Sequence, residues 1–492
     1  MTSFFVTYGT SNTQSLAAGE TGLVTTAGSM MPASGVSPIA MSGATLTVYG
    51  AVMGTDAPAV ALVNTDDAAN SITIGASGTL SATGGGGVID GLGMGLGFPN
   101  LILTNFGLIA GAGVGTDGVL LQAGGNRINN AGTIFAADDD AIQINNGFGT
   151  SDSLYANTII NSGTISGTTA LNVASLAGNR IVNSGLMQGT DVAIRLNGNG
   201  ADHLINTGQI VGDVLTGPGD DVIDLRGGTV NGVVNGGTGS DLYLIDDPAV
   251  EITEGSETGV TDEVRAWCDY ALADEIEVLT LRGEALRGTG NALANTITGN
   301  AFDNLLDGDD GNDTVLGGRG DDTIFGSGGD DSIEGGGGAN LLYGDAGADT
   351  VVDGNGDSRL LGGGGNDSLL GSWGEDTLIG GSGADVLRGG GDGDSFVFRR
   401  VSDSLSTGRD RIADFVSGED RIDLSQIDAD IGAAGDGAFT FVDHFSGDAG
   451  ELRMRVVNGN GFLEGDVDGD GGADFSIMLV GVTEIAAGDL IL

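Results

Sequence analysis

The stretch that decides the fold is Gly317-Gly318-Arg319-Gly320-Asp321-Asp322-Thr323-Ile324-Phe325, one of eleven consecutive nine-residue units that fill residues 299–397. Glycine occupies the first position in ten units and the fourth in nine, as tight turns with positive φ require. The eighth position is always apolar: Leu306, Val315, Ile324, Ile333, Leu342, Val351, Leu360, Leu369, Leu378, Leu387 and Phe396. A disordered linker has no reason for this regularity. A solenoid of short strands does, because each strand points one residue into a stacked core, so the stretch predicts a parallel β-roll.

The sixth position of the unit carries the chemistry. Asparagine or serine stands there in three units, at Asn304, Asn340 and Ser358. The other eight units have a carboxylate: Asp313, Asp322, Asp331, Asp349, Asp367, Asp376, Asp385 and Asp394. Carboxylates stacked one strand spacing apart (roughly 4.8 Å) repel each other unless a cation lies between them. Calcium suits this position because it takes six to eight hard oxygens, so we expect Ca²⁺ at these aspartates. A solvated acidic face is the alternative.

Two units make one turn of the roll, so alternate units lie on opposite edges. One edge stacks only aspartates, at Asp313, Asp331, Asp349, Asp367 and Asp385. The other edge is mixed: Asn304, Asp322, Asn340, Ser358, Asp376 and Asp394. We expect the first edge to bind calcium in every gap, and the second to bind it best near Asp376 and Asp394.

Composition and charge narrow the classes of partner. The 492 residues include 68 acidic and 17 basic side chains, a net charge of −51, which argues against nucleic acid and anionic membranes. Such a chain repels itself, so bound cations should assist folding. The single cysteine, Cys268, excludes an intrachain disulfide. Residues 1–23 lack the basic region and apolar core of a Sec signal, and no apolar run is long enough to span a membrane.

A second, looser repeat occupies residues 50–215, after a polar segment at 1–49 that is expected to act as a cap. Its signature is Asn-x-Gly-x-apolar, with the asparagines 22 to 31 residues apart at Asn105, Asn130, Asn161, Asn183 and Asn206. Coils of this length predict a larger parallel β-helix whose asparagines stack as a ladder inside the turns. The repeat type resembles the passenger regions of autotransporter adhesins and the pectin-lyase-like superfamily.

Residues 216–298 are expected to form a transition and spacer between the two solenoids. This segment holds two isolated nonapeptides, with Asp221 and Asp241 at position six. Because they fall outside the regular register, they could bind one calcium ion or none.

The C-terminal module, 398–492, carries a family resemblance. Asp410-Arg411-Ile412-Ala413-Asp414-Phe415 and Gly450-Glu451-Leu452-Arg453 are similar to the C-terminal domain of serralysin-type secreted proteases. With the nonapeptides, the chain resembles RTX (repeats-in-toxin) proteins. That resemblance implies a β-sandwich-like module with an uncleaved type I secretion signal, a type I secretion apparatus as partner and an extracellular location. The last residues, Asp489-Leu490-Ile491-Leu492, suit such a signal.

An acidic loop in this module matches the front half of an EF-hand loop. Asp466, Asp468 and Asp470 stand at the alternating ligand positions. Ile477 occupies the place of the bidentate glutamate, for which Asp474 could substitute. The loop is therefore either a further calcium site or a plain acidic β-turn.

Catalytic motifs are not recognisable. Serralysins are zinc proteases with an H-E-x-x-H motif, but this sequence has only His203 and His444, so protease activity is not carried over. A β-helix joined to RTX repeats also resembles alginate epimerases, whose Tyr-Gly and Asp-Pro-His motif is not reproduced here. The cluster 138–140, three consecutive aspartates, suggests a pectinase-like site. Asp117 and Asp191 occupy similar places before their own strands, so we interpret all of these as turn residues.

The sequence therefore predicts an all-β protein with an N-terminal parallel β-helix, a calcium-binding parallel β-roll and a C-terminal module. The favoured function is a secreted calcium-binding RTX protein that folds on extracellular calcium, with the β-helix as an adhesive or structural surface for extracellular polysaccharide or a cell surface. The alternative is a lyase-like or epimerase-like enzyme that modifies polysaccharide at a site on the β-helix.

Overall fold

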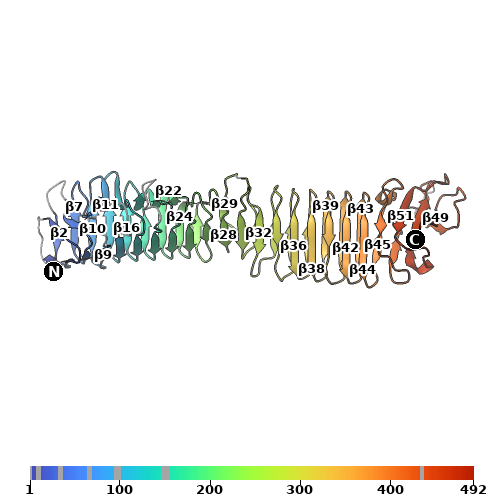
Figure 1. Ribbon diagram of the computed structural model, residues 1–492, viewed down its shortest axis with the longest axis horizontal. Helices are drawn as coiled ribbons and strands as arrows, with labels where there is room; N and C mark the ends of the chain where they lie inside the picture. Colours follow the sequence, from blue (N-terminus) through green and yellow to red (C-terminus); the bar gives the residue numbers. More distant parts are fainter. Residues whose placement is uncertain are drawn as a thin grey trace. The chain divides into compact units, whose positions relative to one another are not determined.

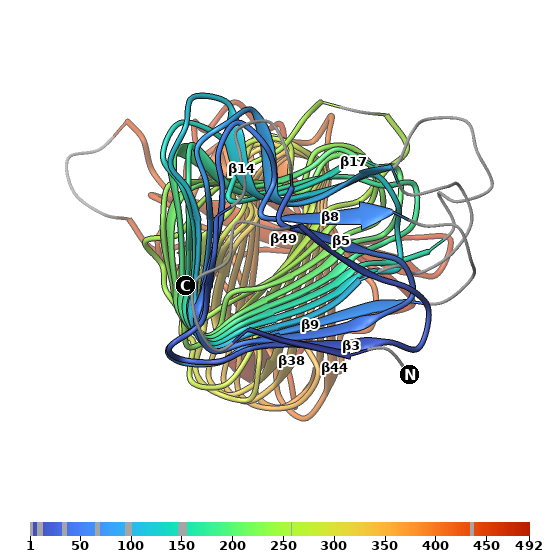
Figure 2. The same ribbon diagram turned by 90° about the vertical axis from the view of Figure 1, so that its left-hand side faces the viewer.

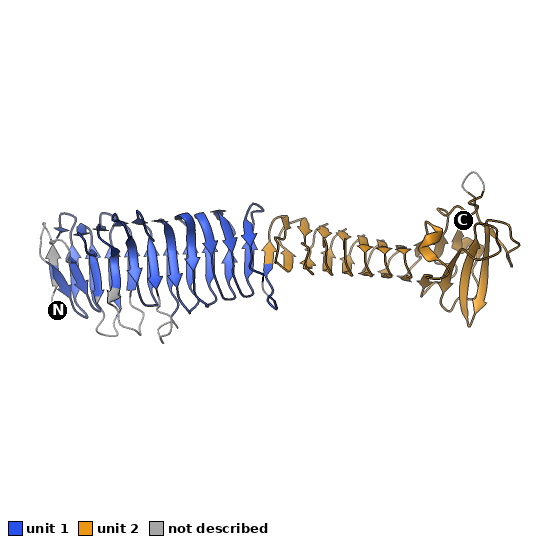
Figure 3. Ribbon diagram, turned by 90° about the horizontal axis from the view of Figure 1, so that it is seen from above, with its two compact units in different colours: residues 1–263 blue, residues 264–492 orange. Residues whose placement is uncertain are grey.

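The computed structural model describes residues 3–6, 13–31, 37–63, 69–93, 101–145, 155–256, 258–432 and 437–492. The chain divides into two compact units, unit 1 (residues 1–263) and unit 2 (residues 264–492; Figure 3). Strands follow one another along the chain from β1 to β52 (Figure 1), with short 3-10 helices η2 (Val401–Ser404) and η3 (Ala487–Asp489). The predicted all-β solenoid is confirmed. In the described ranges no helix is long and apolar enough to cross a membrane.

Unit 1 is a parallel β-helix with three faces, because each coil contributes three successive strand segments. The first face contains β1 (Ser3–Val6), β3 (Thr21–Val24), β6 (Thr45–Val48), β9 (Asn70–Ile74), β12 (Leu101–Asn105), β15 (Arg127–Asn130), β18 (Thr158–Asn161), β21 (Arg180–Asn183), β23 (His203–Asn206), β25 (Val222–Asp224) and β28 (Leu242–Ile245). The second face contains β4 (Ser29–Met30), β7 (Ala51–Gly54), β10 (Thr79–Ala82), β13 (Leu108–Gly111), β16 (Thr133–Ala136), β19 (Thr164–Ser166), the first parts of β22 (Leu186–Leu196) and β24 (Gln209–Leu215), and β26 (Thr229–Asn231).

The third face of unit 1 contains β2 (Gln14–Leu16), β5 (Ile39–Met41), β8 (Val60–Val63), β11 (Gly86–Gly93), β14 (Thr116–Leu121), β17 (Ile142–Asn145), β20 (Thr169–Ala174), the second parts of β22 and β24, β27 (Val233–Asn235) and β29 (Glu251–Thr253). In Figure 2, β3 and β9 lie on one side of unit 1, and β5, β8 and β17 lie on another. Adjacent faces meet at corners. Polar residues are concentrated at these corners.

The core of unit 1 is built from residues that repeat once per coil. On the first face Ile72, Leu103, Ile128 and Ile159 stand in register on adjacent strands, and all are fully buried. Alternate residues of each strand point outward, which is the period-two pattern of a strand with one buried face. Every coil thus buries its apolar stripe against the coils before and after it.

The predicted asparagine ladder is present at the corner between the first and second faces. Each side chain donates from Nδ2 to Oδ1 of the next asparagine at 2.8 Å. The members are the five predicted ones: Asn105, Asn130, Asn161, Asn183 and Asn206. All five are buried, and their hydrogen bonds to one another and to turn backbone satisfy the amides there.

Unit 2 is a narrower roll with two faces. One face contains β32 (Val278–Leu281), β34 (Thr296–Thr298), β36 (Thr314–Arg319), β38 (Ser332–Gly337), β40 (Thr350–Val352), β42 (Ser368–Trp373), β44 (Val386–Gly391) and β46 (Arg411–Ile412), after β30 (Glu263–Ala266). The other face contains β31 (Tyr270–Ala271), β33 (Arg287–Thr289), β35 (Leu305–Asp307), β37 (Thr323–Phe325), β39 (Leu341–Ala346), β41 (Arg359–Gly364), β43 (Thr377–Ser382), β45 (Ser395–Val397), β47 (Arg421–Asp423) and β52 (Leu490–Ile491).

The nonapeptide pattern explains this roll directly. Strands pair in parallel with a shift of 18 residues, so that Ile324 stacks on Leu342 and two units make one turn. All eleven eighth-position residues are at most 1% exposed, which confirms the predicted core column. Glycines at position four adopt positive φ, for example 112° at Gly320 and 134° at Gly329, and a Cβ on Gly329 would lie 1.8 Å from the Gly311 oxygen. Only glycine permits this turn.

Parallel stacking continues beyond the eleven nonapeptides. β46 pairs with β44, and β47 pairs with β45, so a further coil follows Val397. An antiparallel sheet then forms from β49 (Glu451–Val457), β50 (Asn460–Asp466) and β51 (Phe475–Leu479), with β48 (Thr440–Phe441) beside β49.

The two nonapeptides of residues 216–244 are not isolated. β25 pairs in parallel with β23 before it and with β28 after it, so Asp221 and Asp241 lie in a continuous stack. They do lie outside the 18-residue register, as the sequence predicted, because these coils are 19 to 21 residues long.

Candidate metal centre

The position-six aspartates form two columns, one on each edge of the roll. In both columns Oδ1 accepts a hydrogen bond from the backbone N–H of the position-six residue one turn earlier. Asp331 accepts from the Asp313 N–H at 2.8 Å and donates its own N–H to Asp349 Oδ1 at 2.9 Å. On the other edge Asp394 accepts from the Asp376 N–H at 3.0 Å. The residues predicted for each edge therefore lie in one column, and successive members are 18 residues apart.

The second carboxylate oxygen has no such bond. Among the described residues, Oδ2 is buried and lacks a hydrogen-bond partner in seven of the eight predicted aspartates: Asp313, Asp322, Asp331, Asp349, Asp367, Asp376 and Asp385. These side chains are 1–3% exposed. Burying a charged oxygen without a partner is strongly unfavourable, so the column requires protons or a cation.

Glycine leaves space beside each of these oxygens. A Cβ on Gly326, the first residue of its unit, would lie 2.4 Å from Asp331 Oδ2 and 2.7 Å from the Gly344 carbonyl oxygen. A Cβ on Gly308 would meet Asp313 Oδ2 and the Gly326 oxygen in the same way. Each gap between turns is therefore lined by a carboxylate and a backbone carbonyl, which are the hard oxygen ligands that calcium prefers.

The electrostatics agree with this reading. Burial, together with the charges of the neighbouring aspartates of each column, raises the pKa of Asp313, Asp367 and Asp394 to about 7. Backbone N–H donors lower the pKa, but they do not offset the loss of water. A divalent cation in the gap would supply the positive charge that these carboxylates need in order to ionise, so the residues present fit calcium.

The columns are longer than the sequence predicted. Asp410 Oδ1 accepts from the Asp385 N–H at 2.9 Å, and Asp420 Oδ1 accepts from the Asp394 N–H at 3.0 Å, which adds one aspartate to each edge. Burial raises the pKa of Asp410 to about 8. Both residues were assigned to the C-terminal module because they lie 25 and 26 residues from their partners. The triplet Asp-x-apolar, as in Asp410-Arg411-Ile412, could have found them.

A third column runs through unit 1, at the corner between the third and first faces. Asp221 accepts from the Asp202 N–H at 2.6 Å, and Asp241 accepts from the Asp221 N–H at 2.8 Å. Asp262 accepts from the Asp241 N–H at 2.8 Å, and Asn179 donates to Asp202. Asp202 and Asp262 were not predicted, although each begins the same Asp-x-apolar triplet.

Toward the N-terminus this third column changes from aspartate to asparagine. Asn126 donates both its backbone N–H and its side-chain Nδ2 to Asn157 Oδ1, each at 3.0 Å. Asn157 donates to Asn179 in the same two ways, at 3.2 and 2.9 Å. An amide thus offers a donor where a carboxylate offers a second acceptor. The asparagine part of the column needs no cation, whereas the aspartate part does.

One gap on the mixed edge of the roll is closed by side chains alone. Asp353 stands at position one, where the other units have glycine, and its buried carboxylate lies between two turns. Its Oδ1 accepts from Asn340 Nδ2 at 2.7 Å, and its Oδ2 accepts from the Ser358 hydroxyl at 3.0 Å. The unit that begins at Asp353 has Ser358 at position six, so its carboxylate comes from position one instead. The sequence analysis did not predict this exchange.

Two further acidic groups bring oxygens close together. Asp466, Asp468 and Asp470 place carboxylate oxygens within 4.8 Å of one another. Both oxygens of Asp466 accept loop N–H groups, from Gly469 at 2.7 Å and Gly471 at 2.8 Å, as an acidic turn would. Asp474 accepts from the Val467 N–H at 2.7 Å. This geometry is compatible with both predicted alternatives.

The second group is Asp241, Glu254 and Asp262 in unit 1. The Tyr243 hydroxyl donates to Glu254 and accepts from the Gly236 N–H at 2.7 Å. Burial raises the pKa of Glu254 to about 7. Here a tyrosine hydroxyl reaches the oxygen-lined gap, which distinguishes it from the gaps of the roll.

Comparison with known proteins relates these columns to a family. The family described as "Peptidase M10 serralysin C terminal" matches residues 165–492, beginning within unit 1. Metalloprotease AprA of Pseudomonas entomophila is 43% identical over 96 residues, 18% of this chain and 19% of that protein. Serralysin of Photorhabdus luminescens is 42% identical over 94 residues, 18% of each chain. The matched stretches thus span less than a fifth of these relatives.

A solved structure is also similar in sequence. The solution structure of a subunit of the Azotobacter vinelandii mannuronan C5-epimerase is 28% identical, with a TM-score of 0.23, and the likeness covers 31% of this chain and 80% of that one. The family match covers two thirds of the residues, including all of the roll and its acidic columns. This chain therefore belongs to the serralysin C-terminal family of the M10 peptidases.

Proposed function

We propose that this chain is an extracellular protein whose unit 2 folds when calcium ions fill the gaps between its stacked aspartates. The observation that carries the proposal is the column of buried Oδ2 atoms without partners, from Asp313 to Asp385. The Oδ2 atoms of Asp313, Asp331 and Asp349 each lie beside a first-position glycine and a backbone carbonyl. Calcium accepts many oxygens in flexible geometry, whereas magnesium requires a compact octahedron and gives up water reluctantly. The roll therefore favours calcium over magnesium.

The proposal links folding to export. In the low calcium of the cytosol the carboxylate columns repel, and unit 2 stays unfolded and fit for a type I secretion apparatus. In the millimolar calcium outside the cell, binding energy becomes folding energy. Family membership supports this order of events. In the folded chain, the Asp489 carboxylate accepts from the Ser417 hydroxyl at 2.6 Å and β52 pairs with β47, so the last residues pack against the roll.

For unit 1 we propose an adhesive or structural role at an extracellular polysaccharide or cell surface. Its asparagine corners are closed without cations, which gives a rigid scaffold independent of unit 2. Aromatic side chains such as Phe106 and Phe135 are exposed on it and are available for contact. Binding of the full chain to an array of acidic and neutral polysaccharides tests this role, and retention on none of them would contradict it.

Circular dichroism tests the calcium proposal. The full chain is recorded in chelator, then with 5 mM calcium or 5 mM magnesium (concentrations of about the extracellular order). We expect the β-sheet signal to rise with calcium and to change little with magnesium. An equal β signal in chelator and calcium would contradict the proposal, because the columns would then be stable without a cation.

A further inference from the structure

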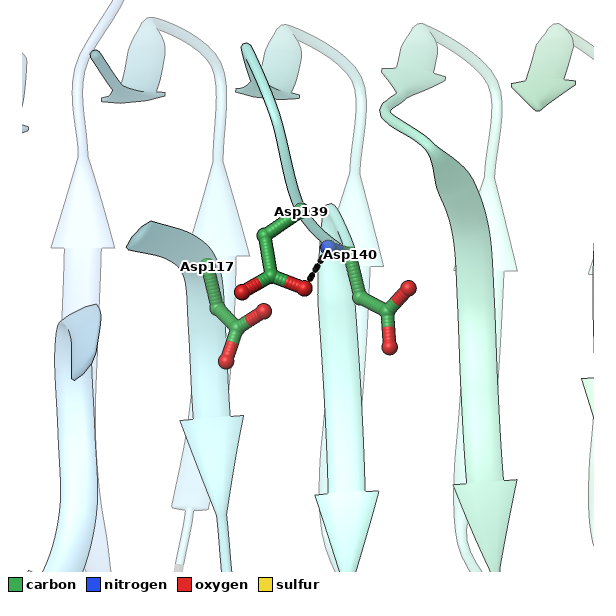
Figure 4. Close-up of side chains that lie close together, drawn as sticks. All are labelled: Asp117, Asp139 and Asp140. Carbon is green, nitrogen blue, oxygen red and sulfur yellow. Dashed lines mark hydrogen bonds between the residues drawn. The ribbon is translucent and has the colours of Figure 1, made fainter. Parts of the chain in front are cut away.

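Unit 1 has three corners, and among its described residues amide ladders run along two of them. The ladder from Asn105 to Asn206 runs along the first, and the asparagine part of the column that begins at Asn126 runs along another. The remaining corner, where the second face turns into the third, carries a group of three aspartates. We call Asp117, Asp139 and Asp140 the corner triad (Figure 4).

The strand register stacks two members of the triad. Val119 of β14 pairs with Ile142 of β17, so Asp117 and Asp140 hold the same position on adjacent coils. The Gly118 N–H donates to the Asp140 carbonyl oxygen at 3.2 Å and fixes this alignment. The prediction that Asp117 is a turn residue is wrong, because it lies within β14 and is 3% exposed. The superficially similar Asp191 lies in β22 and is exposed.

Hydrogen bonds hold two of the three carboxylates in place. Asp139 Oδ1 accepts from the Asp140 N–H at 3.0 Å, drawn as a dashed line in Figure 4. Asp140 Oδ2 accepts from Asn172 Nδ2 at 2.7 Å and from Gln143 Nε2 at 3.2 Å. These donors orient the side chains but add no positive charge, so the triad remains acidic.

Asp117 supplies an unpartnered oxygen inside this group. Its Oδ1 is buried and has no hydrogen-bond partner in the described part of the chain. Figure 4 shows the Asp117 carboxylate directed toward that of Asp139. One ligand oxygen from each of the three residues lies within 4.8 Å of the others. Oxygens that share one calcium ion stand at most about 5 Å apart, because each Ca–O distance is roughly 2.3–2.6 Å.

The surroundings favour a cation as the missing partner. Burial and, to a smaller extent, the charges of Asp139, Asp140 and Asp90 together raise the pKa of Asp117 to about 8. All three of those charges are negative. The half-buried Asp139 gives the triad an opening toward solvent, through which an ion can enter.

We propose that the corner triad binds one calcium ion in unit 1, outside the nonapeptide repeats. The ion would take hard carboxylate oxygens from two adjacent coils and pin β14 against β17. It would thereby join adjacent coils at this corner, as the amide ladders join coils along the other two. This site does not depend on the function proposed for unit 2.

Asp117→Asn in the full chain tests the site, with Asp138→Asn and Asp191→Asn as matched exposed controls. Native mass spectrometry in calcium should count one ion fewer in D117N than in the wild type and an unchanged number in both controls. Asp139→Asn, at the half-buried position, should also lose one ion, and it serves as the test if D117N does not fold. An unchanged ion count in both D117N and D139N would overturn the proposal.

Hydrogen exchange and diffraction give independent readouts. Amides of residues 116–121 and 139–145 should exchange more slowly with calcium than with chelator in the wild type, and this difference should vanish in D117N but persist in D138N. Crystals of the full chain grown with manganese should show an anomalous peak among the three carboxylates. Equal exchange with and without calcium in the wild type, or no peak at millimolar manganese, would contradict the site.

Discussion

Replacing Asp331 by asparagine should change the stability of unit 2 in opposite directions with and without calcium. Asp331 is buried in the middle of the unbroken column and borders two gaps, one toward Asp313 and one toward Asp349. The substitution keeps the size and the Oδ1 acceptor but removes one negative charge. Asp330, its exposed neighbour, also accepts a backbone N–H, from Ala348 at 2.8 Å, and Asp330→Asn is therefore the matched control.

The expected magnitudes follow from the two gaps. A bound ion at 100 times its Kd stabilises the folded state by about 2.7 kcal/mol, so weakening both gaps lowers stability in calcium by up to about 5 kcal/mol. In chelator, two charged neighbours about 4.8 Å apart repel by about 3 kcal/mol at an effective dielectric of 20, and this repulsion is relieved. The new amide can also donate to the next carboxylate, as Asn179 Nδ2 donates to Asp202 Oδ1 at 2.8 Å.

Thermal unfolding followed by circular dichroism measures both effects. For a unit of this size each kcal/mol shifts Tm by about 2–4 °C, so D331N should lower Tm in 5 mM calcium by up to about 10–20 °C. In chelator the same variant should raise the residual β signal. D330N should match the wild type in both conditions. A fall in stability in both conditions would refute the reasoning, because it would mean that the carboxylate acts through packing and not through its charge.

Further changes probe other parts of the fold. Leu342→Ala, in the apolar column, should lower stability in calcium by about 2–5 kcal/mol, measured by thermal unfolding, and an effect below 1 kcal/mol would contradict the stacked core. Asn161→Ala should leave ladder groups on both sides unpaired and destabilise unit 1 by about 1–3 kcal/mol, seen as faster hydrogen exchange in adjacent coils but not in unit 2. In chelator, amides of residues 158–183 should stay protected while those of unit 2 exchange; loss of protection in both would show that these coils of unit 1 also depend on calcium. Without calcium, lower pH should favour folding of unit 2, because the folded pKa of Asp313 is about 7 and that of Asp410 about 8, above the ordinary aspartate value. The stabilisation is fully present below about pH 4 and is lost as pH rises through about 7–8, so the β signal in chelator should be larger at pH 5 than at pH 8.5.

Sequence reasoning succeeded where the period is constant. The nonapeptides repeat without insertion, so the eighth position identified the core and the sixth identified both columns from Asp313 to Asp394. The ladder beginning at Asn105 was also predictable, because its Asn-x-Gly signature carries the turn chemistry within a few residues. In both cases the local pattern and the stacked structure demand the same side chain.

The other site residues could not be predicted for two reasons. The coils vary in length, and one carboxylate comes from a different position of the repeat unit. Asp202, Asp262 and Asp410 stack as the repeat aspartates do, but insertions of one to several residues between coils conceal their spacing. Asp353 supplies its carboxylate from position one, which a position-by-position comparison treats as a lost glycine. Asp117 and Asp191 look alike in sequence, and only the coil register separates a buried residue from an exposed one.

The column at the corner between the third and first faces of unit 1 also has an evolutionary consequence. Asparagine and aspartate occupy equivalent places in it, from Asn126 to Asp262, and their codons differ by a single base. One mutation can therefore convert a coil that is satisfied by its own amide into one that calls for a metal ion, or the reverse. Because each coil contacts only its neighbours, such changes can accumulate one coil at a time. The border between metal-independent and metal-dependent coils can thus move along the chain without any change of fold.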